Sequence, residues 1–370
     1  MSAETAAQDD PLFHPTDLGA IKIRNRVLMA PLTRNRAEHD GVPGELATTY
    51  YRQRAGAGAI ITEATQISPM GKGYLDTPGI HTEQQAHQWK KITDAVHAEG
   101  GKIIIQLWHV GRISHVSLLP EGRSPVSSTD KRADQQTFTA NGFEDCSKPE
   151  ALTIEGIKAT VEDFREGARL AKMAGFDGIE VHAANGYLID QFLQDGVNDR
   201  TDEYGGSIEN RMKFLEEVLN AVADHWLPSE TGVRLSPLGQ ANDMSDSDPE
   251  AHFAKVYEML SGYQLAYLHV VESFPGNDDS GGRDLLVRLR KHYDGFYIAN
   301  GGYDAKMARE AIESGHAEAV TFGRPFIANP DLPKRMKLSA EMNEPDPDTF
   351  YGGGKEGYID YPTLEEVQAA

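Results

Sequence analysis

The sequence is poor in cysteine and has no long apolar run. Cys146 is the only cysteine among 370 residues, so we expect no intramolecular disulfide, no cysteine metal cage and no iron–sulfur cluster. The longest apolar runs, such as residues 102–108, are far shorter than the ~20 residues that a membrane helix needs. The N-terminus lacks the basic and then apolar pattern of a signal peptide. We therefore expect a cytoplasmic protein without a membrane span.

Basic residues are scarce relative to acidic ones. The chain has 36 Lys and Arg residues against 57 Asp and Glu, which gives a formal net charge of -21. Such a surface would repel a phosphate backbone, so the composition argues against a nucleic-acid partner. An acidic surface stays hydrated in concentrated salt, and the salt screens its self-repulsion. The composition therefore raises the hypothesis of a salt-tolerant protein.

The chain contains a regular alternation of short apolar runs and amphipathic stretches. Strand-like runs lie at residues 26–32, 59–64, 102–107, 178–182, 232–236, 266–271, 296–300 and 319–323. Helical patterns lie between most of them, for example at 82–99, 153–174, 207–224, 248–261 and 304–313, and several open on Ser, Thr or Asp caps. Eight βα units in a chain of this length predict an α/β protein with one (β/α)₈ TIM barrel, a single domain over residues 1–370.

Two segments depart from the βα period. Residues 12–26 carry Gly19 and Ala20 between short apolar segments, which predicts a hairpin that closes the bottom of the barrel. Residues 109–150 form a long polar stretch after the third strand, rich in Gly, Ser, Pro and Asp. We interpret this stretch as an elaborated loop or small β subdomain that caps the barrel mouth.

The fourth strand leads into three polar side chains, His182, Asn185 and Tyr187. Active sites of TIM barrels lie at the C-terminal ends of the strands. If the chain turns helical after Val181, His182 and Asn185 share a face, and two donors could then hold one oxygen while the phenol reaches a neighbouring atom. The alternative is that His182 only bonds a backbone carbonyl, as a histidine at a strand end often does.

Polar residues also follow the other strands. They include Thr33, Glu63, Thr65, Gln106, Trp108, Arg234 and Glu272. Each residue alone has a structural explanation, and Glu272 could simply be solvated. Together they would lie on one rim, which favours a functional site.

The seventh and eighth strands end in glycine-rich turns. Gly301 and Gly302 follow the seventh strand, and Gly323 and Arg324 follow the eighth, where TIM barrels commonly bind phosphate. Glycine lets the backbone approach an anion, and Arg pairs with it bidentately. The alternative is that the glycines are helix-entry turns and that Arg324 makes a surface ion pair. We predict a phosphate-bearing ligand or cofactor.

Two other patterns carry little weight. Residues 352–357 satisfy G-x-G-x-x-G, but no predicted strand precedes them and no helix follows, so a C-terminal loop is expected. His109, His115 and His182 lack the spacing of metal ligands, and the carboxylates do not cluster with them. We therefore expect no metal.

Six motifs resemble the old yellow enzyme family of FMN-dependent ene reductases, especially its bacterial branch of N-ethylmaleimide, pentaerythritol tetranitrate and morphinone reductases. The resemblance covers nearly the whole chain. The motifs are MAPLTR (29–34), YYRQRA (50–55), EAT (63–65), QLWHVGR (106–112), DEYGGSIENR (202–211) and FGRPFIANP (322–330).

The resemblance implies a role for each candidate residue. Around the isoalloxazine ring of FMN it places Pro31, Leu32, Thr33, Ala64, Gln106 and Arg234. It implies that Gly302, Gly323 and Arg324 hold the FMN phosphate. His182 and Asn185 would bind the substrate oxygen, Tyr187 would protonate the α-carbon, and Trp108 and Tyr351 would be pocket walls.

The implied reaction uses NADPH or NADH to reduce FMN, which then reduces an activated alkene such as an enone, enal, maleimide or nitroalkene. Nitrate esters are a further implied substrate. A flavin-free phosphate-binding lyase or isomerase and a flavin storage protein are the alternatives. The lyase or isomerase would usually need a Schiff-base Lys or paired carboxylates at strand ends, and neither is present there. Both a monomer and a homodimer suit this fold.

Overall fold

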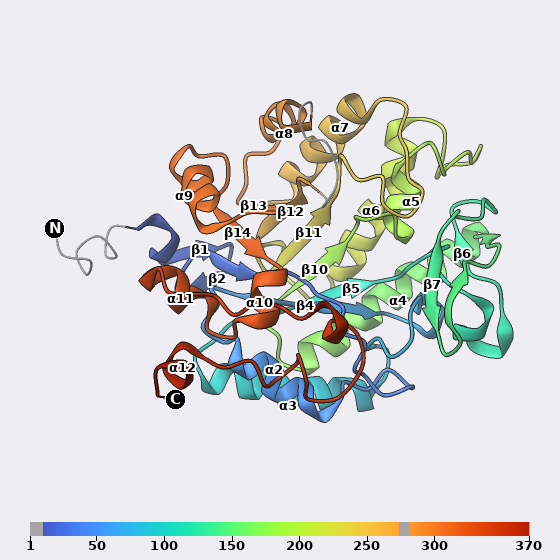
Figure 1. Cartoon of the computed structure of the whole chain (residues 1–370). Coiled ribbons are helices and arrows are strands. Elements are labelled where there is room, and N and C mark those ends of the chain that lie inside the picture. The colour runs from blue at the N-terminus through green and yellow to red at the C-terminus, as the bar shows by residue number, and fades with distance from the viewer. Residues whose placement is uncertain (1–9, 274–281, 370) are drawn as a thin grey trace.

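Eight parallel strands close into a barrel in the order β10-β11-β12-β13-β14-β3-β4-β5 (Figure 1). The computed structural model describes residues 10–273 and 282–369. The strands are β3 (Val27–Met29), β4 (Ile60–Gln66), β5 (Ile103–Trp108), β10 (Gly178–His182), β11 (Thr231–Leu235), β12 (Tyr267–Val271), β13 (Tyr297–Asn300) and β14 (Ala319–Phe322). Each overlaps one of the expected runs, so the TIM barrel is confirmed.

Helices surround the barrel (Figure 1). The five helices named from the sequence are present as α3 (Glu83–Ala98), α4 (Ile154–Met173), α6 (Ile208–Val222), α7 (Pro249–Gly262) and α9 (Ala305–Glu313). Each begins directly after a capping side chain that accepts a backbone N–H, namely Thr82, Thr153, Ser207, Asp248 and Asp304. The structure also contains α2 (Glu45–Gln53), α5 (Leu188–Leu193), α8 (Gly282–Arg290), α10 (Arg324–Ala328), α11 (Leu332–Leu338) and α12 (Leu364–Ala369).

The expected N-terminal hairpin is present. Its antiparallel strands are β1 (Thr16–Leu18) and β2 (Ile21–Ile23). Gly19 turns between them with a φ of 58°, and a Cβ there would lie 2.3 Å from the Ser229 carbonyl oxygen, so the turn requires glycine. The apolar side chains of the hairpin pack against Ile104 and Ile298, which are near the starts of their strands. The hairpin therefore closes the N-terminal end of the barrel.

The segment after β5 contains two short strand pairs. β6 (Val126–Ser127) pairs with β9 (Glu150–Ala151), and β7 (Gln136–Thr139) forms an antiparallel hairpin with β8 (Gly142–Asp145). The backbone N–H of Leu75 donates to the Phe138 carbonyl oxygen at 2.9 Å. This contact attaches the β7–β8 hairpin to the loop after β4.

The barrel interior changes from apolar to polar along its axis. Because side chains alternate along a strand, residues two apart share a face. Ile104 belongs to the apolar cluster at the barrel bottom, and Gln106 follows it on the same face of β5. Tyr267 and His269 are related in the same way on β12. The polar half of the interior therefore lies at the C-terminal ends of the strands.

Candidate active site

His182 ends β10 and is only 3% exposed. Its Nδ1 accepts a hydrogen bond from the Ala184 backbone N–H at 3.3 Å, so in the neutral ring the proton is on Nε2. Burial, reinforced by the positive charge of Arg234 and by His269, lowers the pKa of His182 well below its ordinary value. His182 is therefore neutral and donates through Nε2. The hydrogen bond that it makes to the backbone is to an N–H group and not to a carbonyl, unlike the alternative considered from the sequence.

The chain does not turn helical after Val181, so the expectation of a shared helix face was wrong. Asn185 and Gly186 have positive φ angles of 59° and 74°, and α5 begins only at Leu188. Two hydrogen bonds hold this turn: the Asn185 N–H donates to Ser236 Oγ at 2.7 Å, and the Gly186 N–H donates to Asp190 Oδ2 at 2.8 Å. The left-handed region suits Asn and Gly. A strand end and a tight turn therefore present His182 and Asn185.

Tyr187 directly follows this turn and precedes α5. Its ring lies 5.1 Å from the His182 ring and 5.0 Å from the Trp108 ring, nearly perpendicular to both. Its hydroxyl lies 3.1 Å from the hydroxyl of Tyr74, and Tyr74 stacks on Trp108 at 5.9 Å. Burial raises the pKa of Tyr187, so its phenol keeps its proton at neutral pH. The structure thus brings a partly buried phenol beside the imidazole.

The residues expected around a flavin ring all lie at the C-terminal ends of strands. Ala64 on β4 is the register partner of Gln106 on β5, and His182 is the partner of Arg234 on β11. The other three residues, Pro31, Leu32 and Thr33, lie in the loop after β3, one residue beyond its end. The fold therefore places the six residues on the rim that carries His182.

Gln106 and Arg234 have partners that leave polar atoms for a ligand. Gln106 Nε2 donates to Glu180 Oε1 at 2.6 Å, and Arg234 Nη2 donates to Asn300 Oδ1 at 2.9 Å. Among the described residues, the buried Arg234 Nε has no hydrogen-bond partner. Such buried groups normally find one. This unpartnered donor fits a polar ligand at the mouth.

Two glycine turns lie at the ends of β13 and β14. Gly302 has a φ of 67°, and among the residues that the structure describes a Cβ added there would meet nothing closer than Ser273 Oγ at 3.8 Å. At Gly323 the nearest described atom to such a Cβ is Leu32 Cδ2 at 3.3 Å. Arg324 is exposed and begins α10. The open backbone at Gly302 and Gly323, with this guanidinium beside it, fits an anionic group such as phosphate. We call these three residues the glycine cradle.

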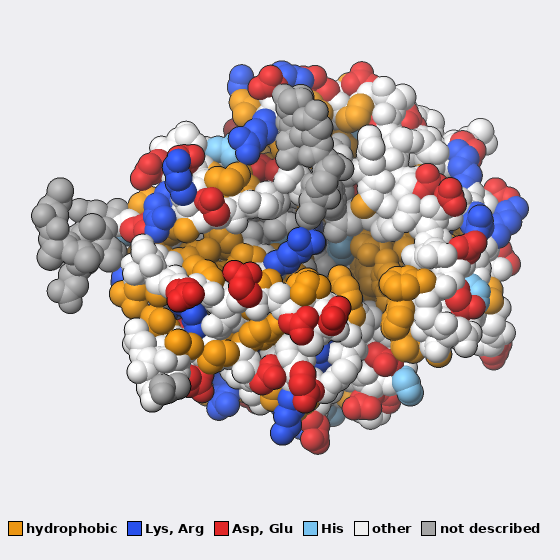
Figure 2. Space-filling view, viewed as in Figure 1, with side chains coloured by type: hydrophobic (Ala, Val, Ile, Leu, Met, Phe, Trp, Pro, Cys, Tyr) orange, Lys and Arg blue, Asp and Glu red, His pale blue; other side chains and the backbone are white. Residues whose placement is uncertain are grey.

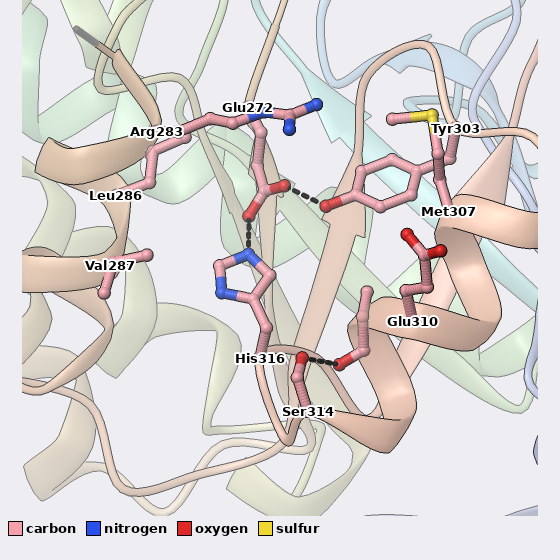
Figure 3. A pocket seen from close by; sticks show the side chains of 10 residues that line it. Glu272, Arg283, Leu286, Val287, Tyr303, Met307, Glu310, Ser314 and His316 are labelled. Carbon is pink, nitrogen blue, oxygen red and sulfur yellow. Dashed lines mark hydrogen bonds and ion pairs between the residues drawn. The ribbon is translucent and has the colours of Figure 1, made fainter.

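A cavity of about 380 Å³ between α8 and α9 has Glu272 on its wall (Figure 3). Glu272 is buried rather than solvated. It accepts hydrogen bonds from Tyr303 Oη at 2.5 Å, Tyr297 Oη at 2.9 Å and His316 Nε2 at 2.6 Å. Tyr303 directly follows Gly302 in the sequence, so its hydrogen bond to Glu272 holds the residue next to the glycine cradle in place. The expected catalytic side chains are not part of the cavity lining.

Tyr351, expected as a pocket wall, is 66% exposed in this structure. The next residue, Gly352, donates its N–H to the Arg34 carbonyl oxygen at 2.9 Å. The C-terminal segment is thereby fixed to the loop after β3, beside Thr33. In Figure 2 hydrophobic side chains surround a hollow near the middle of the visible face.

The remaining patterns have simple outcomes. Residues 352–357 follow the short 3-10 helix Pro347–Thr349 and a bend, and no strand directly precedes them, as the sequence context predicted. Within residues 10–273 and 282–369, no group of three His, Cys, Asp or Glu side chains is placed to hold a metal ion. None of the helices in those ranges is long and apolar enough to span a bilayer.

Sequence reasoning missed two residues at the mouth. Tyr74 lies in the loop after β4, and Asn242 lies in the loop after β11. Asn242 Nδ2 donates to the Asn185 carbonyl oxygen at 2.8 Å, and Asn242 itself has a positive φ of 60°. The only local signal was the Asn-Asp pair at 242–243, which favours a turn. Neither residue has a periodic pattern that relates it to β10.

The fold and the site describe a (β/α)₈ barrel enzyme with a glycine cradle and neutral hydrogen-bond donors at its mouth, the class that binds a phosphate-bearing cofactor there. The chain belongs to the NADH:flavin oxidoreductase / NADH oxidase family, whose model matches residues 11–343. It is therefore an oxidoreductase with FMN as its cofactor. This membership removes the flavin-free lyase or isomerase alternative.

Individual relatives match along nearly the whole chain. The 12-oxophytodienoate reductase 1 of Oryza sativa subsp. japonica is 45% identical over 368 residues, which cover 98% of this chain and 95% of the relative. Morphinone reductase has a TM-score of 0.93 and 47% identity, over 97% of this chain and 98% of its own. The old yellow enzyme homologue from Zymomonas mobilis has a TM-score of 0.92 and 41% identity, over 95% and 99%. The resemblance to the old yellow enzyme family is confirmed.

Proposed function

We propose that this oxidoreductase is an ene reductase that uses NADPH or NADH to reduce enones, enals, maleimides and nitroalkenes, with nitrate esters as a further substrate class. The relatives named 12-oxophytodienoate reductase and morphinone reductase support this class, because both substrate names denote a ketone. When bound, FMN supplies the hydride that adds to the β-carbon of the alkene.

Two groups of residues would hold the FMN. The glycine cradle of Gly302, Gly323 and Arg324 would bind its phosphate through backbone N–H groups and the guanidinium. The ring would lie against Pro31, Leu32, Thr33, Ala64, Gln106 and Arg234. Arg234 would stabilise the negative charge of the reduced ring, because its buried Nε and the positive guanidinium are at the mouth.

His182 and Asn185 would bind the oxygen of the activating group. The observation that carries this proposal is the hydrogen bond from the Ala184 N–H to His182 Nδ1 at 3.3 Å. This bond commits the neutral ring to donating through Nε2. Asn185 adds an amide donor. It lies on a turn in which the backbone N–H groups of Asn185 and Gly186 are both hydrogen-bonded. Two neutral donors on one oxygen would withdraw electrons from the alkene and favour hydride addition at the β-carbon.

Tyr187 would deliver the proton to the α-carbon. Its hydroxyl keeps the proton at neutral pH, because burial raises its pKa. The Tyr74 hydroxyl at 3.1 Å would orient the phenol, and Trp108 would pack against its ring. Trp108 and Tyr351 would also contact the substrate.

The test is a comparison of the two half-reactions in Tyr187→Phe. We expect enone reduction to slow by roughly a hundredfold, the low end of what a positioned proton donor contributes, while reduction of the flavin by the nicotinamide nucleotide stays nearly unchanged. Both rates are measured by stopped-flow absorbance. Tyr263→Phe, a partly exposed tyrosine on the surface after α7, is the matched control. Equal loss in both half-reactions would show that Tyr187 is not the proton donor.

The remaining features of the proposal concern organisation. One FMN-binding domain would span residues 1–370, with residues 109–150 as its cap, because the strands on both sides of this segment belong to one barrel. We also propose a cytoplasmic location and a monomeric or homodimeric state.

A further inference from the structure

Four buried polar side chains form a hydrogen-bonded chain across the barrel interior. Gln106 Nε2 donates to Glu180 Oε1 at 2.6 Å, Glu180 Oε2 lies 2.9 Å from His269 Nδ1, and His269 Nε2 lies 2.9 Å from Thr321 Oγ1. Glu180 and His269 are completely buried. Of these four side chains, only Gln106 belongs to the flavin site proposed above.

Glu180 is an anion in this position. Burial by itself would raise the pKa of Glu180, but His269, Arg234 and the Gln106 hydrogen bond together hold it below its ordinary value. Burial lowers the pKa of His269 itself, so we treat His269 as a neutral donor from Nδ1 to Glu180 and Arg234 as the cation that faces it. Arg234 is close because Glu180 pairs with Gly232 in the β10–β11 register, and Arg234 is two residues further along the same face of β11. A buried carboxylate without such partners would be very costly. Glu180 and Arg234 therefore compensate each other's charge.

The anion also determines how the Gln106 amide is oriented. An ionised carboxylate only accepts hydrogen bonds, so Gln106 must direct its NH₂ group to Glu180. The amide oxygen is then available as an acceptor for a ligand N–H. Thr62 Oγ1 fixes the same residue by accepting the Gln106 backbone N–H at 3.2 Å. Gln106 is thus held at its backbone and at its amide.

We propose that Glu180 is a positioning residue for the flavin: its carboxylate orients the Gln106 amide, offsets the charge of Arg234 and so lowers the reduction potential of bound FMN. The inference rests on the flavin placement proposed above. A negative charge disfavours the reduced, more negative ring, and Arg234 has the opposite effect. At an effective dielectric constant of about 20, a unit charge roughly 10 Å away changes such an equilibrium about tenfold or more.

The test is the midpoint potential of FMN in the holoenzyme, measured by spectroscopic titration against a reference dye. In Glu180→Gln we expect a positive shift that corresponds to at least about tenfold in the ratio of reduced to oxidised flavin, or about 30 mV for a two-electron couple. Thr321→Val removes the far end of the hydrogen-bonded chain without changing a charge, and its potential should match the wild type. Equal shifts in both variants would mean that Glu180 has only a structural role and would overturn the proposal.

Two further variants complete the design. Arg234→Met should shift the potential in the negative direction. If it does while Glu180→Gln leaves the potential unchanged, the role of Glu180 is refuted; if neither variant moves the potential, the proposed flavin placement is wrong. Glu180→Asp keeps the charge and should restore the wild-type potential, and a positive shift equal to that of Glu180→Gln would overturn the proposal. If Glu180→Gln releases FMN, retention by Glu180→Asp supports the need for the charge, and release by both contradicts it.

Discussion

Gly302→Ala should weaken FMN binding while leaving the barrel folded. Within residues 10–273 and 282–369, a Cβ at this position would meet no atom closer than Ser273 Oγ at 3.8 Å, so these parts of the protein have room for it. The folding cost comes from the φ of 67°, and a left-handed residue with a Cβ costs roughly 1–2 kcal/mol. The Cβ would stand in the open space that the cradle offers to the phosphate. Losing one hydrogen bond to a charged group costs about 1.5–3 kcal/mol, or about ten- to hundredfold in affinity.

Gly315→Ala is the matched control for this prediction. Gly315 has a φ of 73°, and an added Cβ would meet no atom of the described residues within 4 Å, so its folding cost should equal that of Gly302→Ala. It lies in the turn after α9, at the opposite end of the helix from the cradle. FMN release from each holoenzyme is followed by flavin fluorescence after dilution, and the thermal midpoint reports stability. Equal FMN release from the two variants would refute the phosphate assignment.

Two other predictions concern pH and salt. Burial raises the pKa of Asp190 to about 7, so the native state retains a proton that the unfolded state releases from about pH 4. The stabilisation that protonated Asp190 provides is therefore complete below about pH 4 and is lost as the pH rises towards 7. Asp190→Asn should flatten this decline in urea unfolding measured across that range, and an unchanged slope would contradict the assignment. The net charge of -21 predicts a thermal midpoint that rises from low to molar NaCl, and a flat or falling midpoint would count against salt tolerance.

Much of the fold could be predicted because barrel strands are covered on both faces. All residues of β5 and β10 are buried, so each strand is visible in the sequence as a short and mostly apolar run. The capping residues Thr153 and Ser207 defined the starts of α4 and α6, since their side chains accept backbone N–H groups in the structure. Local pattern does not encode register. The irregularity in β4 between Ile61 and Ala64 depends on pairing with β5 and could not be anticipated.

The site was predictable where strands deliver its residues and not where loops do. His182, Gln106 and Arg234 lie on strands, so the barrel topology alone places them on one rim. Tyr74 is 113 residues from Tyr187, and its position depends on a loop held by the β7–β8 hairpin. The turn at Asn185 was misinterpreted for a related reason, because its backbone depends on hydrogen bonds to residues of other segments.

The structure separates charge from hydrogen-bond donation at the barrel mouth. The donors proposed for the substrate oxygen are neutral: Asn185 carries an amide, and burial with Arg234 nearby keeps His182 uncharged by lowering its pKa. The fixed charges are on Arg234, the register partner of His182, and on the fully buried Glu180 two residues before His182 on β10. A protonated His182 would be a second cation beside Arg234, and in the part of the chain that the structure describes no carboxylate is hydrogen-bonded to His182. Polarisation of the substrate should therefore not vary with protonation of His182 near neutral pH, and the charge that matters for the flavin should be set by the Glu180–Arg234 pair.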